Sequence, residues 1–168
     1  TRQGPQEEKV AGSRWVVRKV VRRPRRLRGT VAPPGDKSVS HRALILNAIA
    51  RGRANVLGLS SGKDVLSTLE CLRALGVAIE PQGESGAFVV HGREGSLEEP
   101  QEHLDAGNSG TTMRLLSGLL AGQPFMSVLT GDSSLRSRPM GRVVEPLKQM
   151  GTQIMGRKGD TVAPLAIR

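Results

Sequence analysis

The sequence predicts an α/β fold in which one unit of helices and strands occurs twice. From residue 33 onward, stretches with helical apolar spacing alternate with short β-rich runs, and glycine follows the helical stretches. Arg42 and Arg114, each early in a predicted helix, lie 72 positions apart (114 − 42). Gly76 and Gly151, each at a predicted helix end, lie 75 positions apart (151 − 76). Such a repeat indicates two similar units, neither of which buries its apolar face alone.

Residues 1–29 are expected to form a basic N-terminal segment with one strand. Residues 1–13 are polar, and we expect them to be disordered. The valine-rich run 14–23 predicts the strand, and residues 24–29 add positive charge. A nucleic-acid-binding arm is the alternative for this basic run. A strand with one solvated face is favoured, because its valines need an apolar partner.

Four helices and five strands are predicted for residues 30–168. The helices span 40–51, 63–75, 109–121 and 140–150, and are followed by Gly52, Gly76, Gly122 and Gly151. The strands span 55–59, 77–80, 87–91, 125–130 and 162–167. Because 77–80 and 87–91 flank a glycine-rich turn, we expect these two strands to pair.

The composition is that of a soluble globular domain. The length of 168 residues suffices for one core, with 37% hydrophobic and 24% charged residues. No apolar run approaches the roughly 20 residues of a membrane span, and the N-terminus has no run bounded like a signal peptide. A single cysteine, Cys71, excludes an internal disulfide. We expect it to be a core residue in a cytoplasmic protein.

The charge favours small anionic partners. A formal net charge of +10 attracts nucleic acid, membrane headgroups or phosphorylated metabolites. There is no tyrosine, and the aromatic residues are only Trp15, Phe88 and Phe125, too few for the stacking platforms of a single-strand binder. Phosphates and carboxylates of small molecules remain favoured, with a basic surface kept for solubility as the alternative.

Two glycine-containing segments each precede a predicted helix that carries an early arginine. In the first, residues 34–42, Lys37 and Arg42 bracket the helix start and Ser38 adds a hydroxyl, a set that suits a phosphate or carboxylate. The alternative is a simple cap in which Ser40 is the N-cap and the cations are solvated. In the second, residues 106–114, two glycines permit close backbone approach to a ligand. Its alternative is a glycine turn with a cap.

A third segment, residues 131–142, carries three arginines within seven residues and is either an anion clamp or a solvated basic turn. Other motifs fail. Residues 58–64 are one residue too short for a P-loop. No hydrolase elbow is present, so Ser38 beside His41 is not part of a triad. The three histidines lack metal-ligand spacing, so no metal site is expected.

Together the three segments resemble the N-terminal part of the 5-enolpyruvylshikimate-3-phosphate synthases. The matching runs are Pro-Gly-Asp-Lys-Ser-Val-Ser-His-Arg-Ala at 34–43, Gly-Asn-Ser-Gly-Thr-Thr-Met-Arg at 107–114, and Leu-Thr-Gly-Asp-Ser-Ser-Leu-Arg-Ser-Arg-Pro-Met-Gly-Arg at 129–142. The resemblance covers residues 30–168. It implies two domains in an inside-out α/β barrel, each built from three βαβαββ units, with residues 30–168 forming the first two units of an incomplete N-terminal domain.

The resemblance also implies roles for particular residues. Shikimate 3-phosphate is expected to contact Lys37, Ser38 and Arg42. Phosphoenolpyruvate is expected to contact Lys37, Gly110 and Arg138, with Asn108, Thr111 and Arg114 nearby. In this family the herbicide glyphosate competes with phosphoenolpyruvate, and alanine at the position of Gly110 is associated with tolerance.

The implied reaction transfers the enolpyruvyl group of phosphoenolpyruvate to the 5-hydroxyl of shikimate 3-phosphate and releases phosphate, in the pathway to chorismate and the aromatic amino acids. No cofactor, nucleic acid or membrane is implied, and the whole enzyme is expected to be a monomer. Family members are well over twice this length, and their acid and base groups lie outside the matching region, so the catalytic residues are unknown and the chain alone is expected to be inactive. A catalytically silent fragment, or one subunit of a split enzyme, is the alternative. The sister transferase acting on UDP-N-acetylglucosamine relies on a loop cysteine that residues 131–142 lack.

Overall fold

The computed structural model describes residues 6–10, 14–18, 23, 26, 28–83 and 86–168. The chain divides into two compact units, Thr1–Pro33 and Pro34–Arg168, and each is described by itself.

The first unit contains an antiparallel pair of strands, β1 (Gln6–Val10) and β2 (Arg14–Arg18). The prediction of a strand is confirmed for 14–18. The expectation of one strand with a disordered start is wrong for 6–10, because a strand needs a partner for its N–H and C=O groups and β1 supplies it. The rest of the predicted strand, 19–22, lies outside the described residues, as does part of the basic run 24–29.

The second unit has mixed helices and strands, as predicted. In chain order they are α1 (Lys37–Ile49), β3 (Arg53–Val56), α2 (Lys63–Ala74), β4 (Ile79–Pro81), β5 (Phe88–His91), β6 (Leu104–Asp105), α3 (Gly110–Leu120), β7 (Ser127–Thr130), the short 3-10 helix η1 (Leu135–Ser137), α4 (Gly141–Gln149), β8 (Ile154–Gly156), the one-turn α5 (Arg157–Asp160) and β9 (Val162–Ile167). Without η1 and α5, the later half has the order βαβαββ, and the earlier half has the order αβαββ.

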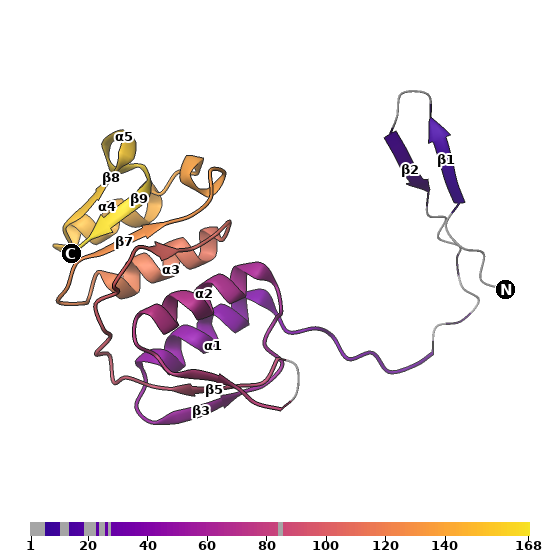
Figure 1. The fold of residues 1–168 in the computed structure, drawn as a ribbon, viewed down its shortest axis with the longest axis horizontal. Coiled ribbons are helices and arrows are strands. Elements are labelled where there is room, and N and C mark those ends of the chain that lie inside the picture. The colour runs from indigo at the N-terminus through magenta and orange to yellow at the C-terminus, as the bar shows by residue number, and fades with distance from the viewer. Residues whose placement is uncertain (1–5, 11–13, 19–22, 24–25, 27, 84–85) are drawn as a thin grey trace. The chain divides into compact units, whose positions relative to one another are not determined.

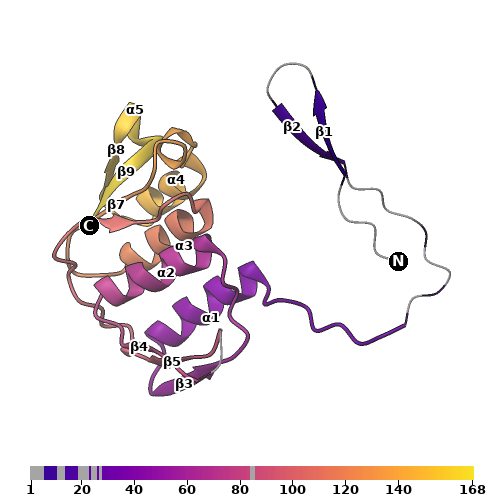
Figure 2. The ribbon, with the colours of Figure 1, turned by 45° about the vertical axis from the view of Figure 1, so that its right-hand side comes forward.

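Three helices lie between two sheets. The sheet β3-β5-β4 is antiparallel, with the predicted pairing of the strands around the glycine-rich turn. In the sheet β6-β7-β9-β8, β6 and β7 are parallel and the other pairs are antiparallel. Helices α1, α2 and α3 run side by side between these sheets, and the chain enters all three at the same end (Figures 1 and 2). The predicted α/β class is therefore confirmed.

Helix α1 begins three residues before the predicted start. Asp36 is the N-cap, because its Oδ1 accepts a hydrogen bond of 2.7 Å from the N–H of Val39. Ser40 lies buried inside the first turn, where its Oγ donates to the carbonyl oxygen of Asp36 and accepts from the N–H of Ser60. The alternative with Ser40 as the N-cap is therefore wrong, and the first turn exposes Lys37 instead.

The glycine ends of α2 and α4 are confirmed. Gly76 and Gly151 have φ angles of 81° and 100°, a left-handed conformation that glycine adopts without steric cost. After each glycine, the next N–H returns to the helix: Val77 donates to the carbonyl of Leu72 and Thr152 to that of Leu147. The two units of the repeat therefore end their second helices in the same way.

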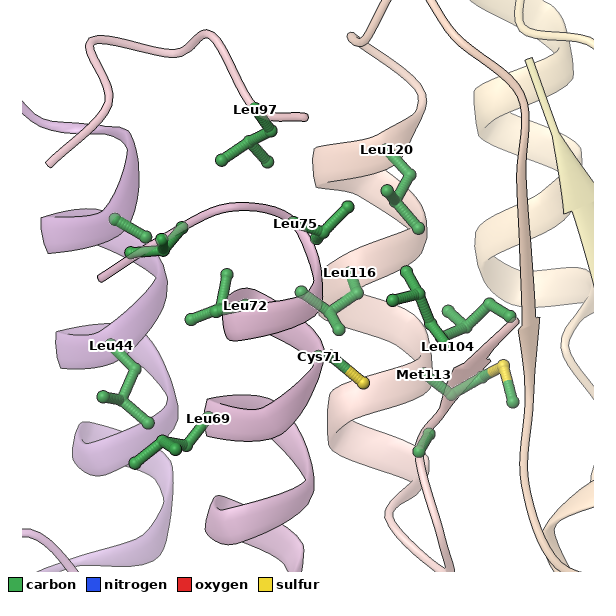
Figure 3. Packing of buried hydrophobic residues seen from close by; sticks show 14 of the residues in the cluster. Leu44, Leu69, Cys71, Leu72, Leu75, Leu97, Leu104, Met113, Leu116 and Leu120 are labelled. Carbon is green, nitrogen blue, oxygen red and sulfur yellow. The ribbon is translucent and has the colours of Figure 1, made fainter. Parts of the chain in front are cut away.

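One hydrophobic core joins the helices. Leucines of α1, α2 and α3 interdigitate in its centre, where Leu44, Leu72 and Leu116 have no exposed surface (Figure 3). Cys71 belongs to this core, as expected, and burial raises the pKa of its thiol to about 12. Within the described ranges, no helix combines the length and the apolar character needed to cross a bilayer. The core fixes the helices relative to one another, and therefore the positions of their first turns.

Candidate functional site

The first turns of α1, α2 and α3 gather at one end of the helical layer (Figures 1 and 2). Lys37 opens α1, Lys63 opens α2 and Gly110 opens α3. The first N–H groups of a helix lack carbonyl partners within it, and the helix dipole is positive there. Three such ends side by side form a surface that favours an anion.

The first segment places its cations and hydroxyl on this surface. Lys37, Ser38 and Arg42 are all exposed. The Lys37 ammonium lies 2.8 Å from Oδ2 of Asp64, and Arg42 Nη1 donates to the carbonyl oxygen of Ser38 over 3.0 Å. The structure thus brings together the three residues that the sequence predicts for one anionic substrate.

The second and third segments are tied to each other by Asn108. Its Nδ2 donates to Oδ2 of Asp132 over 2.6 Å, and its Oδ1 accepts a hydrogen bond from Nη2 of Arg138. Asp132 also accepts from the N–H of Leu135, and the bond from Asn108 is the main reason that the pKa of its carboxyl is lowered. This arrangement holds Arg138, the arginine before proline, beside the start of α3.

Two arginines flank Gly110. Arg114 Nη1 donates to the carbonyl oxygen of Gly110 over 3.1 Å, and its Nη2 donates to that of Pro139 over 3.3 Å. A Cβ placed on Gly110 would lie 2.7 Å from Nη1 of Arg114 and 3.5 Å from Nη1 of Arg138. Gly110 is buried and its φ is not left-handed, so the absent side chain matters here for space. Thr111, beside it, is partly exposed.

Asp64 connects the first turn of α1 to the first turn of α3. Its carboxylate pairs with Lys37 of α1, while its backbone oxygen accepts a 3.1 Å hydrogen bond from Oγ1 of Thr112 in α3. This role of Asp64 was not predicted from the sequence, where residues 58–64 were considered only as a P-loop and rejected. In the sequence, the signal that could have indicated this role is an acidic residue in the first turn of a predicted helix, next to Lys63.

The other arginines of the third segment are not part of this group. Arg136 lines an open pocket of about 240 Å³, whose lining consists of Ser133, Arg136, Ser137, Arg157 and Lys158. Arg142 is exposed in the first turn of α4. Among the residues that the structure describes, no three His, Cys, Asp or Glu side chains cluster as metal ligands would. The site therefore offers cations, hydroxyls and helix starts as its binding groups.

Known proteins are similar to this chain in sequence and in fold. Residues 21–168 match the family described as EPSP synthase (3-phosphoshikimate 1-carboxyvinyltransferase). The 3-phosphoshikimate 1-carboxyvinyltransferase of Chloroflexus aurantiacus (strain J-10-fl) is 58% identical over 146 residues, which cover 86% of this chain and 33% of the relative. That of Herpetosiphon aurantiacus is 53% identical over 152 residues, 90% of this chain and 35% of the relative.

A solved EPSP synthase from Acinetobacter baumannii superposes with a TM-score of 0.79 at 46% sequence identity. The match covers 83% of this chain and 31% of the solved one. The chain therefore spans about one third of the length of the relatives that it matches.

Proposed function

The chain belongs to the EPSP synthase family, and from this premise we propose that its site binds shikimate 3-phosphate and phosphoenolpyruvate for transfer of the enolpyruvyl group to the 5-hydroxyl of shikimate 3-phosphate. Because the chain spans about one third of its relatives, it contributes part of the site. In this proposal residues 30–168 are the first two repeats of an N-terminal domain that is incomplete here.

The convergence of the first turns of α1, α2 and α3, with their cations, is the observation that carries the proposal. Lys37, Ser38 and Arg42 form the shikimate 3-phosphate half of the site. An ammonium, a hydroxyl and a guanidinium at a helix start give a phosphate charge-assisted and ordinary hydrogen bonds together.

The phosphoenolpyruvate half lies at the start of α3. Gly110 allows the backbone to approach the ligand, and Arg138, held by Asn108, supplies a guanidinium for its phosphate or carboxylate. Thr111 and Arg114 border this half. Lys37 is shared, because Asp64 connects it to α3 through Thr112.

In the proposed reaction the substrate hydroxyl oxygen loses its proton and bonds to C2 of phosphoenolpyruvate, while C3 gains a proton. C3 then loses a proton and the bond between C2 and the phosphate oxygen breaks, which restores the double bond and releases phosphate. Both substrates are polyanions, so the cations of this chain lower the repulsion as they meet and hold them in place. The proton transfers need a general acid and base, which we assign to residues outside this chain. His41 is not a candidate, because it is fully buried. We further propose action in the cytoplasm, without a cofactor, a nucleic acid or a membrane, and a monomeric whole enzyme.

A chimera tests the proposal. Residues 30–168 of this chain replace the matching segment of the Chloroflexus aurantiacus relative, and phosphate release from the two substrates is measured. We expect turnover, and loss of turnover when Arg138 is changed to Ala. A folded chimera that releases no phosphate, while the parent enzyme does, would overturn the proposal and favour a catalytically silent chain.

A further inference from the structure

A chain of buried polar side chains runs behind the site and joins its three helices. Nδ1 of His41 in α1 lies 2.7 Å from Oγ1 of Thr68 in α2, and Oγ1 of Thr68 lies 2.7 Å from Oγ1 of Thr112 in α3. Thr112 Oγ1 also lies 2.7 Å from Oγ of Ser109 and 3.1 Å from the backbone oxygen of Asp64. All four side chains are completely buried. None of them can contact a substrate, so they act on the site through the first turns of α2 and α3, where Asp64 and Ser109 lie.

Because each hydroxyl group has one proton, the hydrogen bonds in this series of side chains run in one direction. The backbone oxygen of Asp64 can only accept, and Thr112 Oγ1 donates its single hydroxyl proton to that oxygen or to Oγ of Ser109. Toward Thr68, Thr112 Oγ1 must therefore accept. Thr68 has then used its own proton, and its oxygen accepts from His41. His41 is therefore the first donor of the series, with its proton on Nδ1.

Hydrogen bonds in the reverse direction are less favourable, because they leave a buried N–H group without a partner. If Thr68 donated to His41, the imidazole proton would sit on Nε2, which is buried and has no hydrogen-bond partner. Thr112 would donate to Thr68 instead, and Asp64 would lose the bond from α3. An unpaired buried N–H is rarer in proteins than an unpaired acceptor, and it costs the full loss of hydration. The neutral Nδ1–H form leaves only an acceptor without a partner.

We infer that His41 is a positioning residue. Through Thr68 and Thr112, its Nδ1–H orients the hydroxyl that binds the backbone of Asp64, and so fixes the carboxylate that holds Lys37. The link from His41 to Asp64 follows from the hydrogen bonds given above. Its consequence for substrate rests on the proposed function, in which Lys37 binds shikimate 3-phosphate.

Nuclear magnetic resonance of the 168-residue chain tests the direction without any ligand. We expect the ring-nitrogen shifts of His41 to report the neutral Nδ1–H form. We also expect Thr68→Val, which removes only the linking hydroxyl, to shift the Asp64 amide and Lys37 Nζ resonances. Ser117→Ala is the matched control, because Ser117 is equally buried but bonds only to the carbonyl of Met113 in its own helix. An Nε2–H form in the wild type, or equal shifts in both variants, overturns the inference.

Titration of the chimera described above with shikimate 3-phosphate tests the consequence. Thr68→Val should weaken binding by roughly three- to tenfold, the effect of losing one ordinary hydrogen bond. Thr68→Ser, which restores the hydroxyl, should bind as the unsubstituted chimera does, and so should Ser117→Ala. Unchanged affinity in a folded Thr68→Val chimera overturns the positioning role. If the unsubstituted chimera fails to bind, the proposed function fails, and the His41 form and the Asp64 shifts still decide the geometry.

Discussion

Nζ of Lys37 lies 2.8 Å from Oδ2 of Asp64, so the central cation of the proposed site is held by a carboxylate from the neighbouring helix. The Lys37 side chain is 55% exposed and that of Asp64 is 33% exposed. An ion pair so open to water contributes at most about 1 kcal/mol to folding. The pair therefore acts mainly on the position of Lys37, and changes at Lys37 should affect binding far more than stability.

Lys37→Gln should separate these two effects in the chimera. Loss of one charged partner should weaken both substrates by roughly 10- to 100-fold, whereas the free energy of unfolding should fall by no more than about 1 kcal/mol. Substrate titrations and denaturant unfolding measure the two quantities. Lys148→Gln is the control, because Lys148 pairs with Asp160 away from these helix starts. Equal weakening by both variants would contradict the assignment.

Arg42→Ala should weaken shikimate 3-phosphate more than phosphoenolpyruvate. The guanidinium of Arg42 lies over the first turn of α1, bonded to the carbonyl of Ser38, and in the proposed site it binds the phosphate of this substrate. Its removal should cost about 1.5–3 kcal/mol of binding. Calorimetric titration of the chimera with each substrate gives the comparison, and Arg51→Ala, beyond the far end of α1, is the matched control. Unchanged affinity for shikimate 3-phosphate would show that Arg42 faces solvent only.

Local signals in the sequence predicted the elements that depend on local chemistry. The ends of α2 and α4 follow from Gly76 and Gly151, since few other residues adopt a left-handed φ there. The strands β6 and β8 were missed, because two and three residues are too short for a period and exist only through pairing with β7 and β9. Strand β3 lies two residues before its predicted start for a similar reason, since its pairing with β5 sets its position.

The exposed part of the site could be predicted, and the buried part could not. Lys37, Arg42 and Arg138 stand in segments whose glycines and charges already indicate an anion site. Thr68 and Thr112, by contrast, occur in helices where a hydroxyl usually bonds to its own backbone, so nothing in the sequence distinguishes them from surface residues. Their role appears only when α1, α2 and α3 pack together.

Stability should fall as the pH drops from 6.5 toward the lowered pKa of His41. Burial lowers the pKa of this imidazole below its usual 6.5, so the unfolded chain binds a proton more readily than the folded one. The contribution of His41 is therefore complete above pH 6.5 and is lost as the pH falls through the lowered pKa. Asp132 and Asp160 also have lowered pKa values, but the stability that these carboxylates contribute is lost only below pH 3.8, their ordinary pKa. Melting temperatures across the pH range of the His41 effect measure the slope.

His41→Gln should flatten that slope, because glutamine does not titrate. Exposed His103→Gln is the control for the substitution itself. If His41→Gln does not fold, the titration of the His41 ring in the wild type decides instead. A ring that titrates at or above 6.5 would contradict the prediction.

Asn108→Ala should weaken phosphoenolpyruvate more than shikimate 3-phosphate. Asn108 is the partner that orients Arg138, and it also bonds to Asp132 across the loop. Without it the Arg138 guanidinium stays charged but loses its fixed direction, so we expect a loss of roughly 3- to 30-fold in affinity. Asn47→Ala is the control, since Asn47 bonds only to the carbonyl of Ala43 within α1. Equal losses for both substrates would point to a general disturbance of the loop.

Gly110→Ala should make the chimera less sensitive to glyphosate with little loss of stability. The φ of Gly110 is not left-handed, so alanine fits the backbone. The new methyl group would meet Nη1 of Arg114 at 2.7 Å, the mobile end of a long side chain that can shift. The methyl would still narrow the space at the start of α3. A bulkier inhibitor should lose more than phosphoenolpyruvate does, because overpacking a tight site costs about 1–3 kcal/mol.

The inhibition constant for glyphosate should therefore rise by roughly tenfold or more, while the Michaelis constant for phosphoenolpyruvate rises less. Gly118→Ala is the matched control: it lies in the same helix, and a Cβ there meets nothing within 4 Å. That variant should leave both constants unchanged and stabilise α3 by about 0.5–1 kcal/mol, since alanine favours a helix over glycine. If Gly110→Ala raises both constants by the same factor, the displaced Arg114 has disturbed the whole phosphoenolpyruvate half, and selective crowding of the inhibitor is ruled out.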